Sequence, residues 1–199
     1  MRTNLFHFML VSLSFSVAAL AQQVGPDDAF QVRYAANLAV GDSVVNITNT
    51  GTSGGNVCAN LYTFDPAEEL VSCCTCTITP NALQSLSVLR SLISNTLTAA
   101  VPTAVVIKMV ASSGSTCNAA SVSPDSLASG MRAWGTTIHQ LPTPAPSYGI
   151  TETPFLNAGL VPAELTHITS FCGFIQAIGG GYGICRGCVA GGLGAVPVI

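Results

Sequence analysis

The sequence has few charged residues, and those it has are scattered. Lysine and arginine together number six, aspartate and glutamate nine, and charged residues make up 8% of the chain, where about 25% is usual. No basic cluster exists that could hold a run of phosphates. We therefore expect no nucleic acid among the partners of this protein.

Histidine is equally scarce, and one of the three lies in the N-terminal apolar segment. The other two, His139 and His167, limit any proton transfer or metal binding that depends on imidazole. His167 precedes Ser170 by three residues, a spacing that allows a pair on a helix, but two surface histidines are the simpler interpretation. The sequence points to no catalytic residue, no cofactor and no metal site, and it favours a structural or binding role over an enzymatic one.

Long apolar stretches are absent after the N-terminus. The one candidate covers 16 residues, 5–20, short of the roughly 20 needed to span a bilayer. Arg2 precedes it, and Ala19-Leu20-Ala21 has the small-x-small form of a signal-peptidase site. We predict a signal peptide over residues 1–21, secretion to the extracellular space, periplasm or cell surface, and no transmembrane segment after its removal.

Cysteine, in contrast, is abundant. An even number in an oxidising compartment predicts four disulfides, although sequence alone allows 105 pairings of eight cysteines. Neighbouring strand residues point to opposite faces, so Cys73 and Cys74 should reach different partners. Two short-spaced cysteine groups could also supply four thiolates to zinc, but oxidation in the compartment argues against this. The disulfide candidates are Cys58, Cys73, Cys74, Cys76, Cys117, Cys172, Cys185 and Cys188.

Runs of β-branched and aromatic residues, broken by Gly, Pro, Asn and Ser, predict a mainly β fold, a disulfide-stabilised two-sheet β-sandwich. Residues 65–69 read as a hairpin turn, and with Phe64 opposite Leu70 we expect Cys58 to pair with Cys74 or Cys76. The glycine-flanked Ser53 superficially resembles a protease nucleophile, but a turn between strands explains it better. Residues 86–98 are ambiguous between helix and strand. The predicted strands are 30–38, 43–49, 57–64, 70–76, 105–112, 131–140 and 149–155.

One C-terminal amphipathic helix is predicted over residues 162–178, with Pro162 in its first turn and a run of glycines after its end. Cys172 lies on the apolar face of this helix, so a disulfide there could fix the helix to a sheet. The domain is therefore expected to cover residues 22–178. Residues 179–199 form a glycine-rich tail tied by Cys185 and Cys188, and we expect this tail to bury little side-chain surface.

The predicted surface is rich in hydroxyl groups, because Ser and Thr supply 34 of residues 22–199. A weakly charged surface repels its neighbours poorly. Self-association, contact with a cell surface or matrix, and a neutral monomer all remain open.

Three motifs follow one another along the chain: the stretch from Cys58-Ala59-Asn60 to Phe64-Asp65, the Cys73-Cys74-Thr75-Cys76 element and Arg132-Ala133-Trp134. In this order they resemble a group of uncharacterised exported bacterial proteins that is common in acidobacteria. The resemblance implies export and disulfide bonding, and it assigns no site. We expect a secreted or cell-surface structural or binding protein; the alternatives are a secreted hydrolase and an extracellular module for a small apolar ligand.

Overall fold

The computed structural model describes residues 22–142, 146–178, 182–186 and 188. These residues form nine strands, one α-helix and three short helical turns, and the mainly β prediction is confirmed. The signal peptide predicted over residues 1–21 lies outside the described residues, as does most of the tail. The strands are β1 (Phe30–Ala35), β2 (Val44–Asn49), β3 (Val57–Phe64), β4 (Leu70–Ile78), β5 (Leu83–Ser87), β6 (Val105–Ser112), β7 (Met131–Gln140), β8 (Tyr148–Pro154) and β9 (Leu156–Asn157). The helix is α1 (Pro162–Ala177), and the turns are η1 (Val88–Leu92), η2 (Ala119–Ser121) and η3 (Pro124–Ser126).

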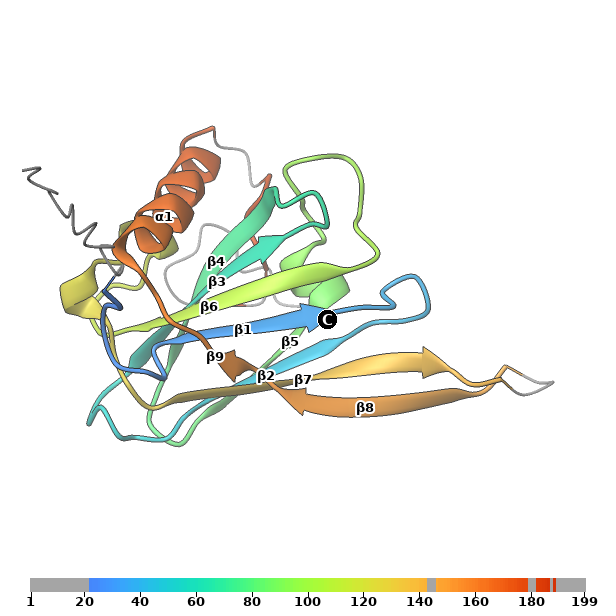
Figure 1. The fold of residues 1–199 in the computed structure, drawn as a ribbon, viewed down its shortest axis with the longest axis horizontal. Coiled ribbons are helices and arrows are strands. Elements are labelled where there is room, and N and C mark those ends of the chain that lie inside the picture. The colour runs from blue at the N-terminus through green and yellow to red at the C-terminus, as the bar shows by residue number, and fades with distance from the viewer. Residues whose placement is uncertain (1–21, 143–145, 179–181, 187, 189–199) are drawn as a thin grey trace, which may run out of the picture.

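The strands form two antiparallel sheets, and α1 adds a third layer (Figure 1). The five-stranded sheet has the order β4-β3-β6-β1-β9, and the four-stranded sheet has the order β5-β2-β7-β8. One apolar core fills the space between the sheets, and a second lies between the five-stranded sheet and α1. Among the described residues, no helix combines the length and the apolar character needed to cross a membrane.

Strands β3 and β4 carry almost no exposed residue, which explains why their sequences lack a polar alternation. In this part of the five-stranded sheet, one face meets the other sheet and the opposite face meets α1. A strand covered on both faces is apolar on both. The ambiguous stretch 86–98 proves to be the end of β5 followed by η1, a single turn of π-helix.

All eight cysteines form disulfides, and three of the four bonds start from β4. Cys73 and Cys74 reach different partners, as predicted, because their side chains point to opposite faces of the sheet. Cys172 does fix α1 to the sheet. With every sulfur oxidised, none remains as the thiolate that zinc requires. The pairs are Cys58–Cys117, Cys73–Cys172, Cys74–Cys185 and Cys76–Cys188.

The predicted pairing of Cys58 with Cys74 or Cys76 is wrong. The hairpin itself is present, and Phe64 does lie opposite Leu70, but an irregularity between Thr63 and Phe64 shifts the register beyond that pair by one residue. A shift of one residue turns each side chain to the other face of the sheet. Cys58 therefore lies opposite a threonine, away from the face that carries Cys74 and Cys76, and it bonds to Cys117.

The expectation that the tail buries little is also wrong for the tail residues that the structure describes. Ile184, Cys185 and Cys188 are buried. Ile184 forms a parallel bridge with Cys73, whose backbone N–H donates to the carbonyl of Gly183 at 2.8 Å. This segment therefore covers part of the outer edge of β4. Its disulfides and backbone hydrogen bonds fix it there, although its glycines have no side chains to pack.

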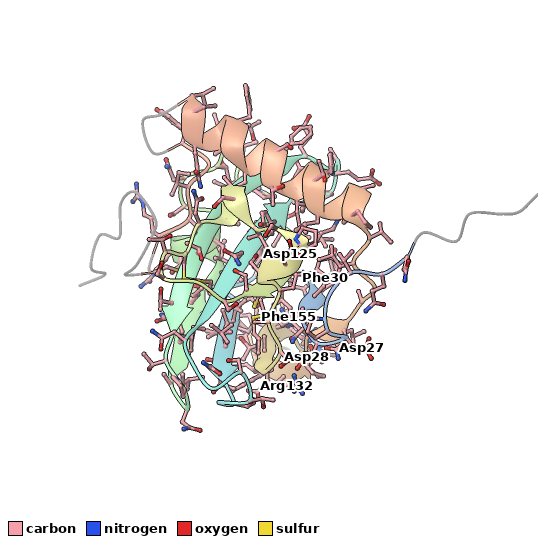
Figure 2. The ribbon with its side chains drawn as sticks, turned by 90° about the vertical axis from the view of Figure 1, so that its left-hand side faces the viewer. Asp27, Asp28, Phe30, Asp125, Arg132 and Phe155 are labelled. Carbon is pink, nitrogen blue, oxygen red and sulfur yellow. A yellow bond between two sulfur atoms is a disulfide. The ribbon has the colours of Figure 1, made fainter. Side chains whose placement is uncertain are left out.

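Several polar contacts join the sheets, and charged residues take part in some of them. At one edge of the domain, Asp28 accepts hydrogen bonds from Arg132 and from the backbone N–H of Gly130; Figure 2 shows the two charged residues side by side, away from α1. Arg33 on β1 is buried and donates to the carbonyls of Gly135 and Thr136, both at 3.0 Å. Burial lowers the pKa of Arg33, because it penalises the charged form.

Candidate functional site

Helix α1 carries two apolar stripes, and only one of them is used by the core. Leu165, Ile168 and Ile175 are buried against the five-stranded sheet. Phe171 and Phe174 lie on a neighbouring stripe and stay 50% and 57% exposed. An exposed pair of large aromatic side chains next to a hollow is a common feature of binding surfaces.

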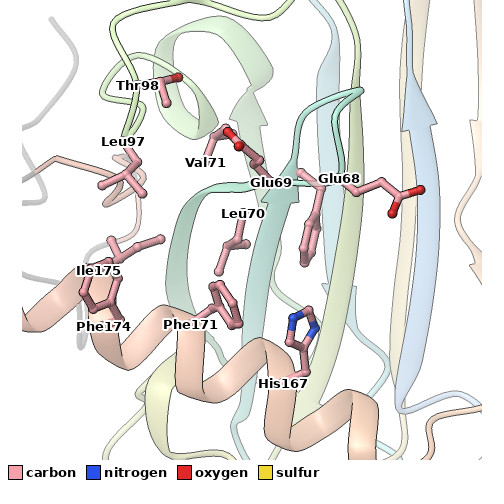
Figure 3. Close-up of a pocket in the computed structure, with 11 residues that line it drawn as sticks. Glu68, Glu69, Leu70, Val71, Leu97, Thr98, His167, Phe171, Phe174 and Ile175 are labelled. Carbon is pink, nitrogen blue, oxygen red and sulfur yellow. The ribbon is translucent and has the colours of Figure 1, made fainter.

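The hollow beside this second stripe has a volume of about 320 Å³ and lies between α1 and the β3–β4 hairpin. Leu70 and Val71 of β4 form its floor, and Leu97 closes one end (Figure 3). The loop that carries Leu97 is held in place because its N–H donates to the carbonyl of Val71 at 2.9 Å. The result is a largely apolar groove whose walls come from three separate parts of the chain.

A polar hollow of about 420 Å³ lies beside the apolar one and shares Phe64, Glu68 and His167 with it. Lys108 forms an ion pair with Glu164 of α1, and its ammonium group also lies 4.6 Å from the centre of the Phe64 ring. These contacts engage the only lysine of the groove. We name the two hollows together the α1 groove, with an apolar end at Leu97 and a polar end at Lys108.

Two glutamates of the β3–β4 turn, Glu68 and Glu69, border the α1 groove. The turn that carries them was predicted: Asp65 accepts the backbone N–H groups of Ala67 and Glu69, and Glu68 adopts a positive φ of 65°. Neither the Glu68 nor the Glu69 carboxylate makes an ion pair or hydrogen bond with any residue in the described part of the chain. Since Lys108 is paired with Glu164, the groove has an excess of negative charge.

His167, a histidine singled out from the sequence, lines this groove. Its ring contacts the Phe171 ring edge-on, with 4.6 Å between the ring centres. Within the described residues it forms no hydrogen bond with Ser170, so the His–Ser pair allowed by the spacing is not made.

His139 lies elsewhere, on the β7–β8 ribbon, in an arrangement that superficially resembles a catalytic triad. Its Nε2 lies 2.9 Å from the Thr151 hydroxyl, and its Nδ1 lies 3.4 Å from the Asn37 side-chain amide. The Asn37 amide nitrogen also donates to the carbonyl of Ile138, so it is the nitrogen that faces the ring. Nδ1 must then accept and Nε2 must carry the proton, the opposite of what a base acting on Thr151 needs.

The remaining sequence candidates do not gather into a site. Ser53 lies in the β2–β3 turn, as predicted, and its hydroxyl donates to the carbonyl of Gly55. In the ranges that the structure describes, no group of three or more His, Cys, Asp or Glu residues could hold a metal ion.

Sequence reasoning missed the α1 groove. Phe171 and Phe174 were not singled out from the sequence, although Phe171 stands three residues after Ile168 and the two phenylalanines extend the apolar pattern of α1 to a second stripe beside the buried one. That second stripe was the available signal. The fold and the groove together define a helix-covered, disulfide-linked β-sandwich with an amphipathic surface groove. Compared with protein-family models, curated proteins and solved structures, the chain matches none of them.

Proposed function

We propose that this is a secreted binding protein, and that the α1 groove takes a small amphipathic molecule with an apolar body and a positively charged group. The observation that carries the proposal is the junction of an apolar groove with the carboxylates of Glu68 and Glu69, for which the described part of the chain supplies no ion-pair or hydrogen-bond partner. Four disulfides support secretion, because such bonds persist mainly in oxidising compartments.

The size and lining of the groove favour a small ligand. Its apolar end, at about 320 Å³, lies at the lower limit of small-molecule sites, which range from roughly 300 to 1,000 Å³ and are lined mainly by apolar side chains. Covering the exposed halves of Phe171 and Phe174 removes roughly 200 Å² from water, worth about 5 kcal/mol before the costs of association. The apolar contacts therefore supply most of the affinity.

The charge of the groove selects the polar group of the ligand. A cation near Glu68 or Glu69 gains an ion pair, whereas an anion meets like charge and must be desolvated without a partner. Exposed ion pairs contribute up to about 1 kcal/mol each. The expected order of affinity is therefore ammonium, then neutral, then carboxylate, for molecules with the same apolar body.

This proposal is tested with three probes that share a phenylbutyl body: 4-phenylbutylamine, 4-phenylbutanol and 5-phenylpentanoate. Binding is followed by calorimetry and by chemical-shift changes in the intact disulfide-bonded protein. We expect Phe171→Ser with Phe174→Ser to weaken the amine and the alcohol at least about tenfold. We expect Glu68→Gln with Glu69→Gln to weaken the amine about fivefold and to leave the alcohol unchanged.

Leu83→Ser is the matched control, because Leu83 is an exposed apolar residue of β5, in the other sheet. It should leave all three affinities as they are. The proposed role of the groove would be ruled out if the double serine variant bound the amine and the alcohol as tightly as the wild type does. It would also be ruled out if the wild type bound the carboxylate probe most tightly.

A further inference from the structure

Within the described residues, β8 is an edge strand, and its open edge belongs to a surface that the α1 groove does not involve. It is the last strand of the four-stranded sheet, and with β7 it forms a ribbon that projects beyond the rest of the domain (Figure 1). Ile150 is 69% exposed and Tyr148 is 53% exposed. Edge strands with such side chains and little charge are the ones that pair with another chain.

The hydrogen bonds at the two ends of β8 show which of its residues face outward. Phe155 N–H donates to the carbonyl of Ala133, and Leu141 N–H donates to the carbonyl of Ser147. Opposed residues of an antiparallel pair alternate between those that exchange hydrogen bonds and those that do not. When the β7–β8 register is followed inward from either end, this alternation shows that the odd-numbered residues of β8 are the ones whose backbone groups bond to β7. The even-numbered ones, Tyr148, Ile150, Glu152 and Pro154, direct their backbone groups to the open edge.

We propose that this edge pairs with the same edge of a second copy of the chain, in an antiparallel register centred on Ile150. The two four-stranded sheets would then join into one continuous sheet. Each Ile150 would exchange backbone hydrogen bonds with Ile150 of the second copy, and each Tyr148 with Glu152 of the second copy.

The sequence of β8 favours this register over the registers centred one and two residues further along the chain. Centring the pair on Thr151 places Pro154 opposite Tyr148, and proline has no N–H to donate. Centring it on Glu152 sets two carboxylates directly opposite each other, which is destabilising. Centring on Ile150 avoids both problems.

Side chains on the outer face of the sheet also fit the register centred on Ile150. Ile138 lies opposite Ile150 on β7, so an isoleucine row would run across the joint from one copy to the other. On the opposite face, Thr151 would lie against Gly149 of the second copy, which leaves room for it. The weak net charge of the chain, −3, opposes such association little.

The experiment compares the mass in solution of the intact wild-type protein with that of two proline variants, by light scattering and sedimentation over a concentration series. Ile150→Pro removes an outward N–H and leaves the β7–β8 hydrogen bonds in place. Ser85→Pro does the same on β5, the opposite edge of the same sheet, where Ser85 also faces outward. We expect the wild type and Ser85→Pro to double in mass with concentration and Ile150→Pro to stay monomeric.

Two further measurements keep the test decisive if Ile150→Pro fails to fold. Hydrogen exchange on the wild type should show the amides of Ile150 and Glu152 protected at high concentration and exchanging freely on dilution. Among variants that each add one cysteine to the disulfide-bonded protein, Ile150→Cys should give a disulfide-linked dimer, whereas Thr151→Cys and Glu152→Cys should not. A wild type that stays monomeric, a dimer that survives Ile150→Pro, loss of the dimer in Ser85→Pro, or cross-linking through position 151 or 152 would each overturn the proposal.

Discussion

Thr63 is a single residue whose burial and bonding do not match. It is fully buried on β3, and its hydroxyl has no hydrogen-bond partner among the described residues. A buried hydroxyl without a partner costs about 1–3 kcal/mol of desolvation. We expect Thr63→Val, which keeps the shape and removes the hydroxyl, to raise the free energy of unfolding by about 1 kcal/mol in urea titrations.

Thr75 provides the matched control on the adjacent strand. It is buried to the same degree, but its hydroxyl donates to the side-chain carbonyl of Asn60 at 2.9 Å. Thr75→Val should therefore lower the free energy of unfolding by about 1–3 kcal/mol. If both valine variants lose stability to the same extent, the Thr63 hydroxyl must be bonded in solution.

At the residue scale, the sequence predicted the chemistry of the cysteines but not all of their partners. Their oxidation was expected from their even number and from the predicted compartment, and the separation of Cys73 from Cys74 follows from strand geometry. The partner of Cys58 depends on the irregularity between Thr63 and Phe64. No proline or glycine marks that position, so the register shift could not be read from the sequence.

Among the elements, the tail segment and α1 are both fixed to β4, and the tail makes more covalent links to it. The tail contributes two disulfides and a backbone bridge to β4, whereas α1 contributes one disulfide. Disulfides that close long loops typically contribute about 2–4 kcal/mol each. We expect a chain ending at Ile178 to lose more melting temperature than the pair Cys73→Ala with Cys172→Ala.

The comparison is made on calorimetric melts of the oxidised proteins. To keep free thiols from confusing the result, the shortened chain also carries Cys74→Ala and Cys76→Ala. An equal or larger loss in the α1 variant would show that the helix attachment dominates and that the buried tail residues add little.

The bounds of helices and strands were predicted well where the local sequence of a segment determines its secondary structure. The bounds of β3, β6 and β7 agree with the predicted ranges because β-branched and aromatic residues fill them between turn residues. Strand β9 was not predicted, since two residues carry no periodicity. The α1 groove was not predicted either, because it exists only once α1, β4 and the loop at Leu97 are placed together.

For the molecule as a whole, the ion pair between Asp28 and Arg132 links the segment before β1 to β7 in the other sheet. Partial burial alone would raise the pKa of Asp28, but hydrogen bonds from Arg132 and Gly130 and the charge of Arg132 together lower it below its ordinary value. A carboxyl with a lowered folded-state pKa stabilises the fold above its unfolded-state pKa, about 3.9, and this stabilisation is lost as the pH falls through the folded-state pKa.

We therefore expect Asp28→Asn to lower the free energy of unfolding by about 1 kcal/mol at pH 6, and this difference from the wild type to shrink toward zero below about pH 4. Urea titrations at several pH values measure it without adding salt. Asp27→Asn serves as the control, since among the described residues the Asp27 carboxylate accepts only from the Gln23 side chain. If Asp28→Asn and the wild type are equally stable at pH 6, or if their difference in stability grows in acid, the ionised Asp28 carboxylate does not stabilise the fold.

The concentration of disulfides on β4 also governs how the chain can mature. The partners of Cys73, Cys74 and Cys76 follow 99, 111 and 112 residues later. A growing chain emerges from its N-terminus at roughly 5–20 residues per second, so these three neighbouring thiols wait several seconds with only Cys58 and Cys117 as early alternatives. Thiolates exchange readily with any disulfide they can reach. A cell that supplies an oxidant but no disulfide isomerase should therefore accumulate full-length chains with mispaired cysteines.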